Sequence, residues 1–144
     1  MAASLPERIA THEAGHVCAA LTYGIPLVHV TVTGHPHAQC GSWRAPQGLA
    51  CEALLTFLLA GPEAEKEFCG ALDDGGDRID VDNARRFLSR QFAPLQVGFQ
   101  LLRYRDAAQR LVRSPWAKQR ICLLADALLR NGALTSDQIF ELRL

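Results

Sequence analysis

The first periodic pattern along the chain is helical. From Ile9 to Leu21, apolar side chains and two histidines recur at intervals of three and four residues. Ser4 and Glu7 have the spacing of a capping box, in which side chains satisfy the first free N–H groups of a helix. Gly24 can end such a helix in the left-handed conformation. We therefore predict a helix over Leu5–Tyr23.

A pattern typical of strands follows this helix. Leu27 to Thr33 is rich in β-branched residues and partly alternates between apolar and polar positions. Gly34 and Pro36 then indicate a turn, after which a second short extended piece is expected near Gln39 to Trp43. These two segments predict one small hairpin or sheet.

The remaining apolar pattern is again helical. A dense core helix is expected from Gly48 to Phe68, with Gly61 and Pro62 kinking it or splitting it in two. Further helices are predicted from Arg78, capped by Asp77 and ended by Pro94, then over Gln96–Val112 and Pro115–Arg130, and finally in a short helix opened by Thr135 and Gln138. The fold class is thus α+β and mainly helical, with a C-terminal helical part and a single domain over residues 1–144.

Composition narrows the classes of function. The 144 residues contain 49% apolar and 21% charged residues, as expected for one folded domain. Fifteen basic residues balance fifteen acidic ones, so charge gives no indication of nucleic-acid binding. The longest apolar run, Ala53 to Gly61, is about half of what a bilayer span needs, and no membrane insertion is expected. The N-terminal residues lack the pattern of a secretory signal.

The five cysteines point to a reducing compartment. Their number is odd and no CxxC pair occurs, which argues against a disulfide framework and against a thiolate zinc finger. We expect reduced thiols, mostly small core residues, in a cytoplasmic protein. They are Cys18, Cys40, Cys51, Cys69 and Cys122.

The segment HEAGH within the first predicted helix carries the strongest chemical signal. His12 and His16 are four residues apart, so both imidazoles lie on one helix face and can reach one Zn2+. Glu13 lies beside the first histidine, where it can take a proton from water whose pKa the metal has lowered. Gly15 is unfavourable inside a helix by roughly 1 kcal/mol, which indicates that another segment packs closely there. The alternative is an ordinary amphipathic helix whose histidines have no metal.

A catalytic zinc requires a third protein ligand. The metzincin pattern is excluded because Thr22 stands where its histidine would be. The remaining candidates on residue type are the histidines His29, His35 and His37, the carboxylates Glu63, Glu65 and Glu67, and the carboxylates Asp80 and Asp82.

Helical phase separates the last two carboxylates. Asp80 shares a face with Ala84 and Leu88 and therefore points toward the core, whereas Asp82 shares its face with Arg85 and points to solvent. An inward carboxylate must be paired, capped or bound to a metal. Phase favours Asp80 as the ligand, and the alternative is an acidic residue that stabilises the first turn of a helix.

Four segments in this order resemble the peptidase domain of the FtsH family, the membrane-bound AAA+ zinc proteases. They are RIATHEAGH at Arg8 to His16, VHVTVTG at Val28 to Gly34, LLAGPEAE at Leu58 to Glu65 and DVDNA at Asp80 to Ala84. The end of the chain, from Ile121 to Leu142, is also similar to the end of such domains, so the resemblance covers most of the sequence.

The resemblance implies a zincin-like fold and a zinc-dependent endopeptidase acting on unfolded or flexible polypeptides. It implies that His12, His16 and Asp80 hold the zinc, with Glu13 as the catalytic base. The sequence contains no GxxxxGK[ST] phosphate loop and no membrane span, so we expect a stand-alone domain to which a separate ATPase or unfoldase could deliver substrate. The region from Phe92 to Val112 is shorter than in the family, so its hexameric state does not carry over.

The resemblance also suggests how a peptide would bind. An extended substrate could pair with the second predicted strand by β-augmentation. The residues expected to contact it are Gln39, Cys40, Gly41, Ser42 and Trp43. Two rival hypotheses remain: a zinc-stabilised, non-catalytic binding or adaptor module, and a helical domain without metal.

Overall fold

The first helix has the predicted bounds. The computed structural model describes residues 3–41, 50–70 and 78–144, and its helix α1 spans Leu5–Tyr23. The hydroxyl of Ser4 accepts a hydrogen bond from the backbone N–H of Glu7 at 3.3 Å. Gly24 ends the helix with a φ of 69°, a conformation that glycine adopts without strain. The local signals at both ends of this helix therefore determine its length.

In the described parts of the chain five further helices follow, and their order agrees with the prediction. Of the two alternatives for the core helix, the split at Gly61 and Pro62 is wrong, because Pro62 lies inside a single helix. The expected start at Gly48 and the expected cap Asp77 lie outside the described residues. The next boundary also differs, since one helix ends at Ser89 and its successor begins at Pro94, whose missing N–H costs nothing in a first turn. The helices are α2 (Ala50–Cys69), α3 (Arg78–Ser89), α4 (Pro94–Arg113), α5 (Pro115–Asn131) and α6 (Ser136–Glu141).

Within the residues that the structure describes, the sheet contains one strand more than predicted. Strand β1 (Leu27–Thr31) lies between β2 (His37–Cys40) and β3 (Ala133–Thr135), and both pairings are antiparallel. β1 is two residues shorter than expected, and β2 begins two residues earlier. β3 was not predicted, because it has only three residues and its last one, Thr135, is also the capping residue of α6.

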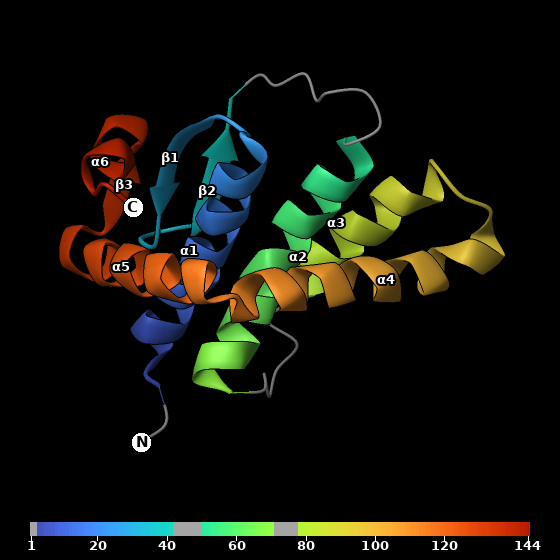
Figure 1. Cartoon of the computed structure of the whole chain (residues 1–144), viewed down its shortest axis with the longest axis horizontal. Helices are drawn as coiled ribbons and strands as arrows, with labels where there is room; N and C mark the ends of the chain where they lie inside the picture. Colours follow the sequence, from blue (N-terminus) through green and yellow to red (C-terminus); the bar gives the residue numbers. More distant parts are fainter. Residues whose placement is uncertain (1–2, 42–49, 71–77) are drawn as a thin grey trace.

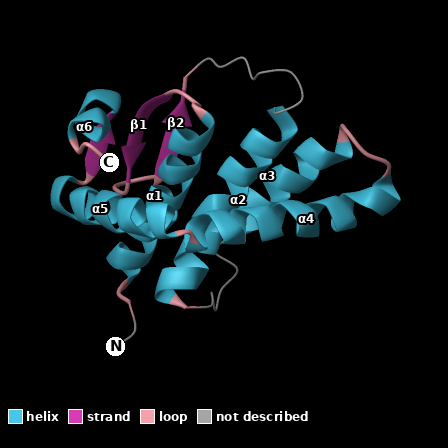
Figure 2. Ribbon diagram, viewed as in Figure 1, coloured by secondary structure: helices cyan, strands magenta, loops and turns pink. Residues whose placement is uncertain are grey.

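Helices α1 and α2 pack against each other and separate two groups of elements. Figures 1 and 2 show the sheet, α5 and α6 on one side and α3 and α4 on the other. A first core, with Val17 and Leu124 at its centre, joins α1, α5 and the sheet. A second core, with Leu55, Leu88 and Leu101, joins α2, α3 and α4. α2 and the C-terminal end of α4 contribute to both cores and therefore hold the two groups together.

The cysteines differ in part from expectation. All five are free thiols, but only Cys18 is buried, so the prediction that most are core residues is wrong. Cys40 and Cys51 are half-buried at the edges of the smaller apolar clusters, and Cys122 is exposed. None of the helices in the described ranges has the length and apolar character of a membrane span.

Gly15 lies at the closest approach of α1 and α2. A Cβ added there would overlap the carbonyl oxygen of Ala60 and would lie 2.7 Å from the Cβ of Ala64. Since the obstacle is partly helix backbone, the two helices would have to move apart. The structure thus supplies the close packing that the glycine indicated.

We expect Gly15→Ala to destabilise the protein, because overpacking by about 1–3 kcal/mol outweighs the gain in helix propensity of roughly 1 kcal/mol. Gly98→Ala in α4 is the matched control, since no atom lies within 4 Å of the added Cβ. That control should stabilise by up to about 1 kcal/mol. Urea denaturation of both variants measures the two changes, and equal effects of the same sign would contradict the close approach.

Candidate metal centre

Three side chains from two helices meet at one point. His12 and His16 lie one turn apart on α1, and Asp80 lies in the first turn of α3. The Oδ2 atom of Asp80 is 2.8 Å from Nε2 of His12 and 3.3 Å from Nε2 of His16. One ligand atom from each residue lies within 4.8 Å of the others, so the three could hold a single metal ion.

The predicted inward orientation of Asp80 is confirmed. Its side chain is 19% exposed and belongs to the helix face that carries the buried Ala84 and Leu88. Asp82 is exposed and does not line the cleft around the three residues. The helical period therefore distinguished the two carboxylates correctly.

Each histidine directs the same ring nitrogen toward the common point. Nδ1 of His16 is 2.7 Å from the backbone oxygen of Phe57, which can only accept a hydrogen bond. Nδ1 of His12 is 3.0 Å from Oε2 of Glu65. With protons on both Nδ1 atoms, the Nε2 lone pairs of the neutral rings face Asp80 and are free for a metal.

Gly61 makes room for the His16 ring. A Cβ at this position of α2 would lie 2.6 Å from Cε1 and 2.7 Å from Cδ2 of the imidazole. A larger residue would therefore push the ring away from Asp80. The sequence contained a signal for this role, since a glycine directly before Pro62 in a dense helix is unfavourable unless something packs against it.

Arg8 orients the carboxylate that holds His12. Its guanidinium is 3.3 Å from Oε1 of Glu65 and donates a hydrogen bond of 2.6 Å to the carbonyl of Cys69 at the end of α2. Arg8, Glu65 and His12 thus form a chain that ends at the metal centre. Glu65 was one of several candidate residues, and Arg8 was not predicted to have a role in the site.

Glu13 is buried beside the three residues. It is 5% exposed, and its Oε2 atom has no hydrogen-bond partner among the described residues. Burial raises the pKa of this carboxyl, although the nearby imidazoles of His16 and His12 act in the opposite direction. A carboxyl with a raised pKa and a free oxygen is well suited to exchange protons with a bound molecule.

In the absence of a metal, His12 and Asp80 share a proton. Burial alone would lower the pKa of His12, but hydrogen bonds to Asp80 and Glu65 and the negative charges around it raise this pKa from 6.5 to about 9. Burial would raise the pKa of Asp80, but the hydrogen bonds with His12 and His16 outweigh it and lower this pKa. At neutral pH the pair is therefore an imidazolium and a carboxylate.

The centre opens into a cleft of about 490 Å³. One wall is formed by His35 to Ala38, which are the first two residues of β2 and the two residues before it, and another by Phe57 and Leu58 of α2. Gln39, Cys40 and Gly41, which were predicted to contact substrate, are not part of this wall, and Ser42 and Trp43 lie outside the described residues. Their predicted role remains a prediction.

The other candidate ligands have different partners. Glu63 is buried and contacts Lys66 and Arg105, while Glu67 pairs with Arg113 at 3.0 Å. Their side chains are thus used in ion pairs between and within helices. The histidines His29 and His37 contact each other rather than Asp80.

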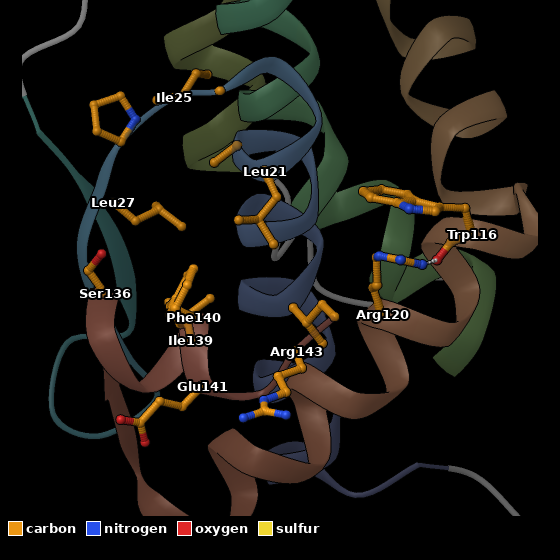
Figure 3. A pocket seen from close by; sticks show the side chains of 14 residues that line it. Leu21, Ile25, Leu27, Trp116, Arg120, Ser136, Ile139, Phe140, Glu141 and Arg143 are labelled. Atoms are coloured by element: carbon orange, nitrogen blue, oxygen red, sulfur yellow. Dashed lines mark hydrogen bonds between the residues drawn. The ribbon is translucent and has the colours of Figure 1, made fainter.

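A larger cavity, of about 940 Å³, lies away from this chemistry. Figure 3 shows apolar side chains such as Leu21, Leu27 and Phe140 along it, with Trp116 stacked near Arg120 at its side. It contains no histidine and no cluster of carboxylates. We therefore assign the candidate function to the smaller cleft, where the ligand atoms converge.

Comparison with protein-family models finds no family that matches the sequence, and comparison with curated proteins finds no match either. The resemblance to FtsH-type peptidases thus depends on the four sequence motifs and stays a prediction.

Metal binding should release the proton of His12. Below its pKa of about 9 this side chain is protonated, so the apparent Kd for Zn2+ should fall about tenfold for each pH unit between pH 7 and 9. Titration with a competing chelator across this range measures the slope. Glu65→Gln removes a negative partner of His12 and should lower the pKa of this histidine. The pH above which the Kd stops falling should then be lower than in the wild type. A Kd that is independent of pH would contradict the proton-holding centre.

Proposed function

We propose that the chain is a zinc-dependent metallopeptidase that hydrolyses peptide bonds in unfolded or flexible polypeptides. The observation that carries this proposal is the convergence of His12, His16 and Asp80 beside the buried Glu13, at the bottom of an accessible cleft. The resemblance of the HEAGH and DVDNA segments to FtsH-type peptidases supports the same reaction.

The donor set fits zinc. Two imidazole nitrogens and one carboxylate oxygen are the ligands that catalytic zinc sites combine with one open position. Zn2+ held by them would polarise the scissile carbonyl and lower the pKa of a water molecule. Glu65 and the carbonyl of Phe57 would keep the rings of His12 and His16 oriented, as outer partners of metal ligands generally do.

Glu13 would move the proton. Its free Oε2 atom can accept a proton from the attacking water and pass it to the leaving amine. The raised pKa helps in both directions, because a carboxyl that titrates closer to neutral pH is a better base and then a better acid. Because Glu13 is buried, bulk water does not occupy the hydrogen-bonding positions of its second oxygen.

An extended peptide could bind along β2. Among the described strands, the order β2-β1-β3 places β2 at an edge of the sheet, and the start of β2 forms part of a wall of the cleft. Free backbone groups of an edge strand can pair with an incoming chain, which would favour unfolded segments over folded ones. This substrate class agrees with the one that the sequence resemblance implies.

Zinc content tests the centre itself. Purified protein resupplied with zinc should hold about one equivalent per chain, and Asp80→Ala should lose most of it because a three-ligand site becomes a two-ligand site. Asp82→Ala, two residues away on the exposed face of α3, should keep it. Elemental analysis measures all three proteins, and zinc below a tenth of an equivalent in the wild type would exclude the zinc peptidase.

Cleavage of casein tests the reaction. Glu13→Gln should keep its zinc and lose activity by about 10²–10⁴-fold, because the amide cannot accept the proton. Gel analysis of casein fragments, with zinc content measured in parallel, separates loss of the base from loss of the metal. If the wild type holds zinc and cleaves nothing, a zinc-stabilised binding or adaptor module becomes the better description.

A further inference from the structure

A second pair of imidazoles meets outside the metal centre. His29 on β1 and His37 on β2 lie on the same face of the sheet, diagonal to each other in the antiparallel register in which His29 pairs with Gln39 and Thr31 pairs with His37. Val30 follows His29 on β1, so its side chain points to the opposite face of the sheet, where it is buried in the first core. Both rings are half-buried, and their centroids are 5.1 Å apart.

The two rings present the same atom to each other. Nε2 of His29 is 3.2 Å from Nε2 of His37, and one N–H···N hydrogen bond can join them in the metal-free chain. Nδ1 of His37 donates to the backbone oxygen of His35 at 2.7 Å, which places the lone pair of its neutral ring on Nε2. The orientation of His37 therefore does not depend on His29.

This spacing is the one that a shared metal ion requires. Two nitrogens bound to one zinc ion at about 2.0–2.1 Å in tetrahedral geometry lie about 3.3 Å apart. The observed separation of 3.2 Å would need almost no movement of either strand. Three consecutive pairings, from His29 with Gln39 to Thr31 with His37, fix the two backbones that carry the rings, so the site is already organised before an ion arrives.

We infer that His29 and His37 form a second site for a divalent transition cation such as Zn2+, Ni2+ or Cu2+, at the side of the cleft. The pair supplies two protein ligands and water completes the coordination, so this site is weaker than the three-ligand centre. His37 lines the same cleft as Glu13. If the cleft binds peptide as proposed above, an ion on His37 would obstruct it at high metal concentration, which amounts to inhibition by excess zinc.

Calorimetric titration of the metal-free full chain with Zn2+ tests the second site without reference to proteolysis. The wild type should bind in a tight step and a weaker step, about two equivalents in total. His29→Gln and His37→Gln should each lose the weaker step and keep the tight one, whereas Asp80→Ala should lose the tight step and keep the weaker one. His35→Gln is the matched control and should keep both.

A single step in the wild type, or a weaker step that survives in His37→Gln, would overturn the second site. Loss of the tight step alone would affect only the proposed peptidase centre, so the two failures can be told apart. Because a strand variant could misfold, the wild type provides a second measurement. On addition of Zn2+ beyond one equivalent, the ring proton resonances of His29 and His37 should shift. Unchanged resonances of the pair would likewise overturn the inference.

Discussion

The close packing of α1 against α2 is the constraint on which the rest of the structure depends. Gly15 lets α1 approach the backbone of α2 at Ala60, and Gly61 lets the ring of His16 lie against α2 one residue further on. At this separation the carbonyl of Phe57 and the carboxylate of Glu65 reach the Nδ1 atoms of the two histidines. A wider interface would leave both imidazoles without the partners that set their tautomers.

The same interface explains the charge balance of the centre. Burial would favour neutral side chains, yet His12 and Asp80 are an ion pair because each stabilises the charge of the other. Glu65, held by Arg8, adds a second negative partner to His12 on the far side of its ring. A series of contacts thus connects four charged groups, which are Arg8, Glu65, His12 and Asp80.

Local rules were sufficient for the features of the site that lie within one helix. The spacing of His12 and His16, the capping signals of α1 and the inward phase of Asp80 all follow from the helical period, and the structure agrees with each. The sequence indicated that something packs on Gly61, but neither the identity of that ring nor the role of Arg8 could be derived in this way, because both depend on atoms more than forty residues away in the chain. β3 was missed for a related reason, since Leu134 is recognisable as a strand residue only opposite Val30.

The ligands of the metal centre come from helices of two different cores. His12 and His16 stand on the helix that belongs to the first core, whereas Asp80 stands on a helix of the second. An ion bound to all three would connect the two halves of the molecule at a second place, in addition to the helices α2 and α4 that contribute to both cores. A movement that separates the two halves would have to break the bond between the metal and Asp80. Such a movement would therefore weaken the binding of the metal.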